Sequence, residues 1–217
     1  MFAVSLGRGG DFRGEWVGRD DLGGAHGARG DGRKVILGAG YFGWADWFAG
    51  MQGIGKTGVP AGNNAYFVPL PFLDIAALEA AAAKHAGDPA AIMIEPAAMC
   101  VHPKDPQHWT DGPYFRRARE LADQHGALLI FDEIVTGFRF RSGSATKAFG
   151  VTADLTCLGK AIANGMPLSA LVSRKGLLMN HVHRNMYEPT MKGETHSFAA
   201  AKAALSIYAT EAVPVAV

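Results

Sequence analysis

The sequence predicts an α/β fold of three layers (α/β/α), with helices on both faces of a mostly parallel β-sheet. From residue 34 onward, short apolar runs alternate with amphipathic segments whose apolar residues recur at helical spacing. The clearest run, residues 127–134, begins fully apolar and ends in two carboxylates. Alternation of strands and helices over this length is typical of a parallel sheet covered by helices.

Each element has its own signal. The expected order is a strand over 35–39, a helix from Asp74 to about Ala86, a strand over 91–95, a helix from about Pro113 to Gly126, strands over 127–134, 154–158 and 168–173, and a helix over 198–210. Asp74 is a good N-cap, and Gly126 is a good C-terminal cap. Pro96 ends the strand before it because proline cannot donate to a ladder.

Residues 1–33 differ in composition from the rest. This tract holds ten glycines and five arginines but little apolar periodicity, so we expect it to be irregular or disordered. A glycine- and arginine-rich arm can bind RNA, but five acidic residues interrupt this one and it lacks RGG repeats. We therefore divide the chain into this tract and a domain over residues 34–217.

The overall composition excludes several classes of protein. The 21 basic residues are balanced by 20 acidic ones, so we expect no nucleic-acid partner. No apolar run is long enough to span a membrane, and no signal peptide is evident. The two cysteines lack ligand-like spacing, and His181 and His183 lack neighbouring ligands, so we expect no metal site and a cytoplasmic location.

Lys160 and Asp132 are the residues most suited to chemistry. Asp132 lies near the end of an apolar strand and Lys160 follows another, and ligands of open α/β sheets bind beyond the carboxyl ends of strands. We expect Lys160 to be partly desolvated there, which would make its amine a better nucleophile toward an aldehyde. A carboxylate at Asp132 could pair with a cationic heterocycle held beside that lysine.

Four stretches together resemble the class III aminotransferases of fold type I, the family that uses pyridoxal 5′-phosphate (PLP). They are IMIEPAA (92–98), HGALLIFDEIVTGFR (125–139), FGVTADLTCLGKAIANGMPLSAL (149–171) and Thr195-His196-Ser197. The similarity covers roughly residues 33–210, and it is nearest to the branch of glutamate-1-semialdehyde aminomutases. It implies that residues 34–217 are part of a large PLP-binding domain.

The resemblance also implies roles for individual residues. Lys160 would form the Schiff base with PLP and move the proton, and Asp132 would hold the pyridine nitrogen. Ile134 or Val135 would lie against one face of the ring, and Tyr41 would stack on the other. Glu95 would belong to the polar wall of the site. Thr195 would reach the phosphate in the neighbouring subunit, which implies a homodimer with a shared site.

The chain departs from the family pattern in three places. Phe42 stands where a histidine usually follows the stacking aromatic residue. The family's phosphate-binding motif has no match before Tyr41, and the small C-terminal domain does not follow residue 210. We therefore expect a partial domain.

Three functions stay open. The resemblance favours transfer of an amino group from an amino donor to an oxo acceptor. The same residues could serve an aminomutase, which moves the group within one molecule, and Val135 leans toward that branch. A chain that lacks the phosphate motif could also be non-catalytic.

Overall fold

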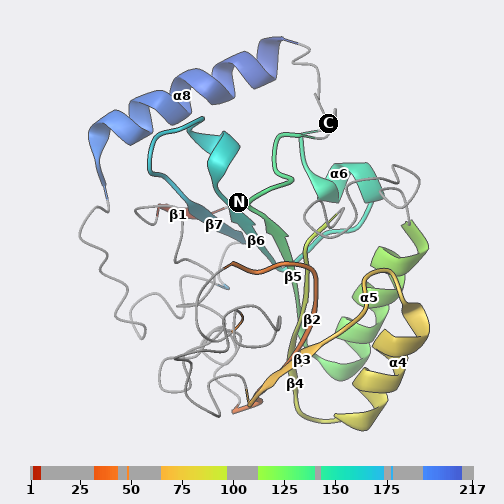
Figure 1. Cartoon of the computed structure of the whole chain (residues 1–217). Coiled ribbons are helices and arrows are strands. Elements are labelled where there is room, and N and C mark those ends of the chain that lie inside the picture. Colours follow the sequence, from red (N-terminus) through yellow and green to blue (C-terminus); the bar gives the residue numbers. More distant parts are fainter. Residues whose placement is uncertain are drawn as a thin grey trace.

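The structure is a computed structural model of the 217-residue chain. It describes residues 2–5, 32–43, 48, 65–96, 112–139, 143–173, 177 and 193–211. At its centre is a seven-stranded sheet in the order β1-β7-β6-β5-β4-β2-β3 (Figure 1). The strands are β1 (Phe2–Ser5), β2 (Val35–Ala39), β3 (Phe67–Pro69), β4 (Pro89–Ile94), β5 (Leu128–Glu133), β6 (Leu155–Leu158) and β7 (Ala170–Ser173).

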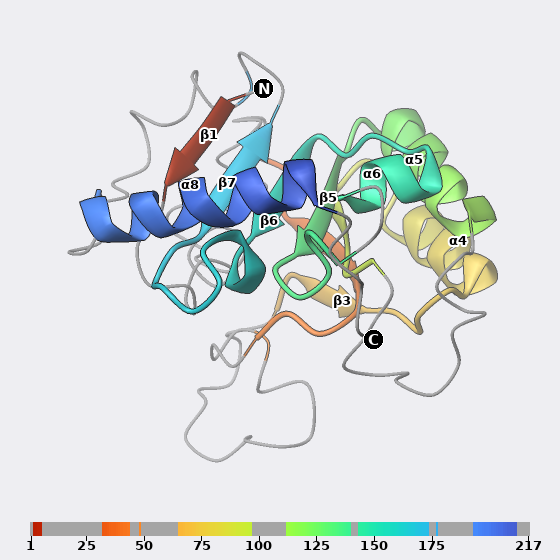
Figure 2. The same ribbon diagram turned by 90° about the horizontal axis from the view of Figure 1, so that it is seen from above.

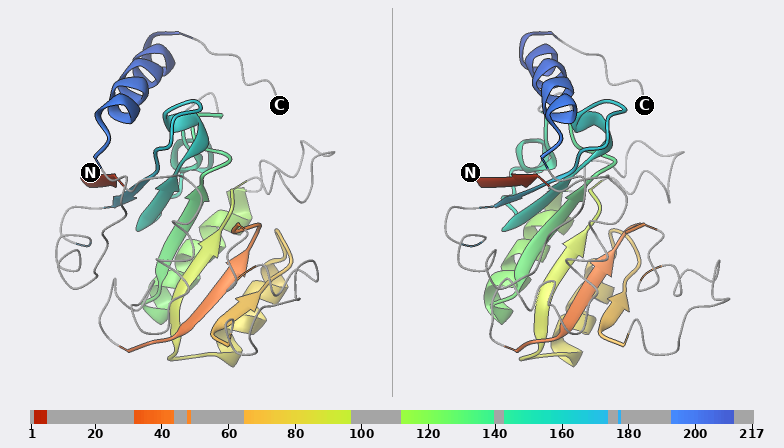
Figure 3. Two further views of the ribbon diagram at one scale, coloured as in Figure 1. Left: turned by 60° about the vertical axis from the view of Figure 1, so that its left-hand side comes forward. Right: turned by 90° about the vertical axis from the view of Figure 1, so that its left-hand side faces the viewer.

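The helices of the described residues are α4 (Ile75–Lys84), α5 (Gly112–His125), α6 (Ala145–Phe149) and α8 (Thr195–Thr210), and a 3₁₀ turn, η2, covers Lys160–Ile162. Strands β3, β2, β4, β5 and β6 pair in parallel, whereas β7 runs antiparallel to both β6 and β1. Figure 3 shows these strands side by side, with the parallel ones in the middle and at one edge. The expected α/β fold with a mostly parallel sheet is confirmed.

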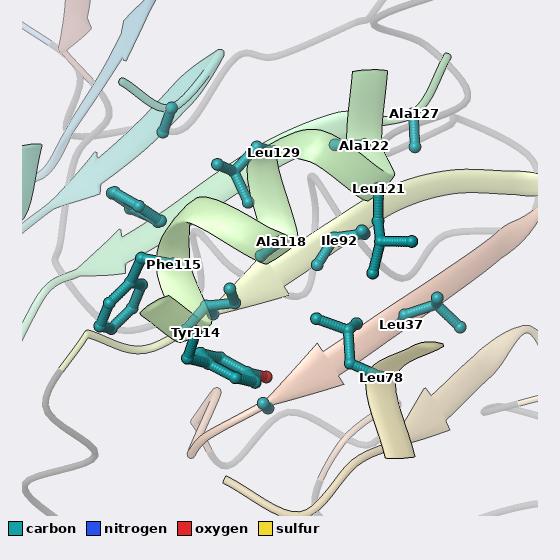
Figure 4. Close-up of a cluster of buried hydrophobic side chains, with 14 of the residues drawn as sticks. Leu37, Leu78, Ile92, Tyr114, Phe115, Ala118, Leu121, Ala122, Ala127 and Leu129 are labelled. Atoms are coloured by element: carbon teal, nitrogen blue, oxygen red, sulfur yellow. The ribbon is translucent and has the colours of Figure 1, made fainter. Parts of the chain in front are cut away.

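Helices α4 and α5 cover one face of the sheet, as the view from above shows (Figure 2). Both helices are amphipathic, and their buried residues meet alternate residues of the strands (Figure 4). The shared cluster includes Leu37, Leu78, Ile92, Tyr114, Phe115, Ala118, Leu121 and Leu129. Burial of this apolar surface fixes the helices against the strands.

A second apolar cluster covers the opposite face of the sheet. It joins Leu128, Ile130 and Ile134 to Phe42 and Phe48, among other residues. Because successive side chains of a strand point to opposite faces, residues 128 and 130 belong to this cluster while 129 and 131 belong to the cluster under α5. The same alternation decides where the polar residues at the end of β5 point.

The predicted caps are confirmed. The Asp74 side chain accepts a hydrogen bond of 2.9 Å from the Ala77 N–H at the start of α4. Gly126 follows α5 with a φ of +61°, in the left-handed region that glycine adopts easily.

Several boundaries differ from prediction. Strand β4 begins at Pro89, two residues earlier than expected, and α8 begins at Thr195 instead of residue 198. The sequence did not reveal β3 or α6, which have only three and five residues, because periodicity needs a longer segment. Within residues 1–33, which we expected to be irregular, Phe2–Ser5 forms β1 and pairs with β7. Residues 6–31 lie outside the described structure.

No helix in the described ranges has both the length and the apolar character needed to cross a membrane.

Candidate functional site

The carboxyl ends of three parallel strands align Gly40, Glu95 and Asp132. Ala39 at the end of β2 is paired with Ile94, and Ile94 at the end of β4 is paired with Phe131. Gly40, Glu95 and Asp132, which come directly after these paired residues, therefore lie at the same edge of the sheet. This is the edge at which open α/β sheets bind ligands.

Asp132 is the inner carboxylate of this edge. It is 1% exposed, and its Oδ1 accepts a hydrogen bond of 3.1 Å from the Ile134 N–H. Strand alternation places its side chain on the same face as Leu128 and Ile130, away from α4 and α5. Asp132 is also paired in register with Cys157 of β6, three residues before Lys160.

Lys160 follows the end of β6 as the first residue of η2. Its φ is +43°, a left-handed conformation that a residue with a side chain rarely adopts. We expected Lys160 to be partly desolvated, and this prediction is wrong. In the described part of the chain, Lys160 lies on a turn beyond the sheet edge and is exposed. The structure thus brings Lys160 to the edge that carries Asp132, but it leaves the lysine open to solvent.

Ile134 connects the segments that follow β5 and β6. It is 2% exposed, and a Cβ added to Gly159 would lie 3.2 Å from its Cγ2 atom. Gly159, next to Lys160, therefore allows close packing between the two segments. Val135 is half-buried, and its carbonyl oxygen accepts a hydrogen bond of 2.5 Å from Arg139 Nε.

Glu95 holds the backbone at Tyr41. Its carboxylate is 1% exposed, and Oε2 accepts a hydrogen bond of 2.9 Å from the Tyr41 N–H. Gly40 has a φ of +133°, and a Cβ there would lie 2.4 Å from the Glu95 Cβ. A larger residue at position 40 would displace Glu95, so the close approach requires glycine. Tyr41 itself packs against the apolar cluster of that face, with its ring edge-on to Phe48.

Glu133 is a buried carboxylate that sequence reasoning did not single out. It is completely buried, and its Oε2 accepts a hydrogen bond of 2.8 Å from the Ala145 N–H at the start of α6. Burial raises its pKa to about 7, and the charge of Asp132 adds to the rise, although the Ala145 hydrogen bond opposes it. The sequence signal was the second acid of the Asp-Glu pair, but its environment depends on α6.

Tyr208 is a second residue that the sequence did not reveal. It lies near the end of α8, where its hydroxyl donates a hydrogen bond of 3.0 Å to the Ala161 carbonyl oxygen. Its ring stacks on Phe138, with centroids 5.4 Å apart. No sequence pattern could link these residues, because they are brought together only by the packing of α8.

Thr195 is the first residue of α8 and is exposed. The contacts between α8 and the Lys160 turn come from residues further along the helix. Its expected contact with a neighbouring subunit stays a prediction. His181 and His183 lie outside the described residues.

Comparisons with known proteins identify relatives. The sequence profile of a family described as Aminotransferase class-III matches residues 71–215. A glutamate-1-semialdehyde 2,1-aminomutase of Syntrophobacter fumaroxidans is 37% identical over 161 residues, which make up 73% of this chain and 36% of that protein. The aminomutase of Roseiflexus castenholzii is 40% identical over 154 residues, covering 67% of this chain and 35% of the relative. The chain therefore spans little more than a third of these relatives.

Among solved structures, the fold is similar to the PLP internal aldimine form of the FumI protein of Sphingopyxis sp. MTA144. The TM-score is 0.79 at 24% identity, and the match covers 97% of this chain and 48% of the other. This similarity shows the fold.

Proposed function

The chain belongs to the class III aminotransferase family, and from this premise we propose that it binds PLP and takes part in PLP-dependent transfer of an amino group. The observation that carries the proposal is the placement of Asp132 and Lys160 at the ends of two paired parallel strands. Open α/β sheets bind ligands beyond the carboxyl ends of their strands. The substrates would be a small-molecule amino donor and an oxo acceptor.

The residues present fit the cofactor chemically. A buried carboxylate suits a protonated ring nitrogen, and a lysine suits an aldehyde. Asp132 and Lys160 would hold these two groups, while Ile134 and Val135 would line one face of the ring and Tyr41 the other. When bound, PLP supplies an electron sink that stabilises negative charge on the substrate carbon next to the nitrogen.

Asp132 would keep the ring nitrogen protonated. Its side chain is buried, and its Oδ1 accepts a hydrogen bond from the Ile134 N–H, which fixes the orientation of the carboxylate. Glu95 would keep Tyr41 in place by accepting the hydrogen bond from the Tyr41 N–H. Gly40 packs so closely against Glu95 that the Glu95 side chain has no room to shift toward β2. These contacts orient the site without taking part in bond changes.

Lys160 would be the group that moves the proton. Its amine is a base when neutral, and from its position beyond β6 it would act on a substrate atom held at the sheet edge. Lys160 is exposed in the single chain, so exclusion of water would have to come from substrate, cofactor or a second subunit.

An aminomutase is the second candidate, and the names of the two curated relatives favour it. Such an enzyme uses the same lysine and carboxylate, but it returns the amino group to a different carbon of the same molecule. Val135 lies beside the proposed ring face and is compatible with that branch.

We also infer a homodimer in the cytoplasm. Thr195 is exposed and could contact the phosphate site of a neighbouring subunit, and the two cysteines of the sequence show no disulfide spacing. Sedimentation velocity with and without PLP tests the dimer, and a chain that stays monomeric at all concentrations would contradict it.

Visible absorbance tests the proposed cofactor. The purified chain should develop an absorbance band on addition of PLP that free PLP lacks, and Lys160→Ala should abolish it. Lys147→Ala removes an exposed lysine of α6 and serves as the matched control, which should keep the band. A wild-type spectrum identical to that of free PLP would mean that this chain is non-catalytic.

A further inference from the structure

The pairing of strands fixes Asp132 more directly than it fixes Lys160. Asp132 lies within β5 and is paired with Cys157, whereas Lys160 follows two residues after the last residue of β6. The backbone at Lys160 is left-handed. This conformation costs free energy and persists only where neighbouring contacts hold it. Something beyond the ladder must therefore keep the lysine in place.

Part of the support is local. The Ile162 N–H donates to the Gly159 carbonyl at 3.1 Å, and the Asn164 N–H donates to the Lys160 carbonyl at 3.0 Å. These bonds close a tight turn, but both partners lie within that turn. They do not set where the turn sits relative to Asp132.

Tyr208 supplies a contact from outside the turn. Its hydroxyl donates to the carbonyl oxygen of Ala161, which is bonded in sequence to Lys160. Its ring stacks nearly parallel on Phe138, at an interplanar angle of 19°, and Phe138 follows Asp132 in the segment after β5. One side chain thus contacts both segments that leave the two functional strands.

The surroundings of Tyr208 fix its own position. Ala201 on the same helix packs against Ile162, Ala163 and Leu168, so α8 is held on the Lys160 turn by apolar contacts. Figures 1 and 2 both show α8 beside the segment that follows β6. Phe138 has a φ of +63° and its N–H donates to the Gly143 carbonyl, so its loop is also closed by a hydrogen bond.

We propose that Tyr208 is a positioning residue for the Lys160 amine, because it ties the backbone beside Lys160 to the segment that follows Asp132. The inference rests on the proposed function, since it treats Lys160 as the cofactor's lysine. Without the hydroxyl, the turn keeps its internal bonds but loses its fixed distance from Asp132. The effect should appear at the lysine and not in the stability of the whole fold.

Two readouts on Tyr208→Phe test this proposal, because the variant keeps the ring on Phe138 and removes only the hydroxyl. In the cofactor-free chain, amide hydrogen exchange of Ile162 to Asn164 should rise about two- to tenfold, the range of one hydrogen bond. With PLP bound, the visible circular dichroism per bound cofactor should fall, because a loosened lysine orients the ring less uniformly. Tyr208→Leu, which also removes the ring, should show larger changes in both readouts.

Tyr66→Phe is the matched control. It deletes a phenol hydroxyl beside β3, an edge strand separated from β6 by three other strands, and should leave both readouts unchanged. If amide hydrogen exchange at the turn is as slow in Tyr208→Phe as in the wild type, the proposal is overturned. A uniform rise of exchange in α4, α5 and the turn would overturn it too, because it would show a general loss of stability.

The two readouts separate this inference from the proposed function. If the wild-type chain shows no PLP band, the proposed function fails, while hydrogen exchange still decides whether Tyr208 holds the turn. If the band is present and neither readout changes in Tyr208→Phe, the function stands and the positioning role fails.

Discussion

Asp132 and Glu133 are adjacent carboxylates that point to opposite faces of the sheet. Asp132 lies on the face of Ile130, and Glu133 lies on the face of Leu129 and Phe131 beneath the helices. Their surroundings therefore differ: Asp132 faces the proposed cofactor site, and Glu133 is enclosed beside the start of α6. The two adjacent carboxylates thus lie in different surroundings.

The raised pKa of Glu133 predicts a pH-dependent stability. Because the folded state holds the proton up to about pH 7 while an unfolded glutamate releases it near 4.5, the free energy of unfolding should fall as pH rises between these values. The loss would be about 3 kcal/mol at most. Denaturant unfolding from pH 4.5 to 8 measures it.

Glu133→Gln should remove most of that pH dependence, since an amide does not titrate in this range. Glu120→Gln, at an exposed position of α5, is the control and should retain the wild-type slope. Equal slopes in wild type and Glu133→Gln would show that Glu133 does not cause the effect.

At the residue scale, the sequence predicted where Asp132 and Lys160 lie because apolar strands end visibly beside them. It could not predict that Lys160 is exposed with a left-handed φ, since this depends on the turn that follows β6. The contacts of Glu133 and Tyr208 were equally hidden, because their partners come from α6 and from the turn after β6.

At the scale of elements, Asp154 joins α5 to the sheet. Its Oδ2 accepts hydrogen bonds from the Leu129 N–H at 2.9 Å and from Arg119 Nη1 at 2.7 Å. Asp154 is 5% exposed and lies immediately before β6, so one carboxylate ties the start of that strand to β5 and to the helix above. These bonds support the register between β5 and β6 near the start of the two strands, and this register aligns Asp132 with Cys157.

Asp154→Ala should destabilise the fold by about 2 kcal/mol, because it leaves the buried Leu129 N–H and part of Arg119 without a partner. Chemical denaturation monitored by circular dichroism measures the change. Asp123→Ala removes the other carboxylate that pairs with Arg119, but Asp123 is 69% exposed, so its loss should cost less than about 1 kcal/mol. Similar losses for both variants would contradict the role of Asp154.

The elements that sequence reasoning predicted are the long or strongly patterned ones, such as α4, α5 and β5. Their apolar faces and caps are encoded within the segment itself. The three residues of β3 and the five of α6 owe their structure to neighbours, Ile36 to Gly38 for β3 and the Glu133 carboxylate for α6. These two segments are too short for a periodic sequence pattern to reveal them.

At the scale of the whole molecule, alternation of strands and helices predicted the fold class but not the order of the sheet. Strand β7 runs antiparallel to β6, and the pairing of β1 with β7 brings together segments that are far apart in sequence. The described residues show helices α4 and α5 on one face of the sheet, while the opposite face carries the row of Gly40, Glu95 and Asp132 at its edge. The proposed site thus lies where the parallel strands end.

The proposed function requires that this edge form one cofactor site in which Lys160 bonds PLP. The most direct measurement is reduction of the PLP-treated chain with borohydride, followed by peptide mapping by mass spectrometry. We predict one dominant modified residue, Lys160, and a large loss of that modification in Asp132→Asn, because the ring would lose its charged partner. Modification spread over exposed lysines such as Lys84, Lys147 and Lys202, with none favoured at Lys160, would contradict the account.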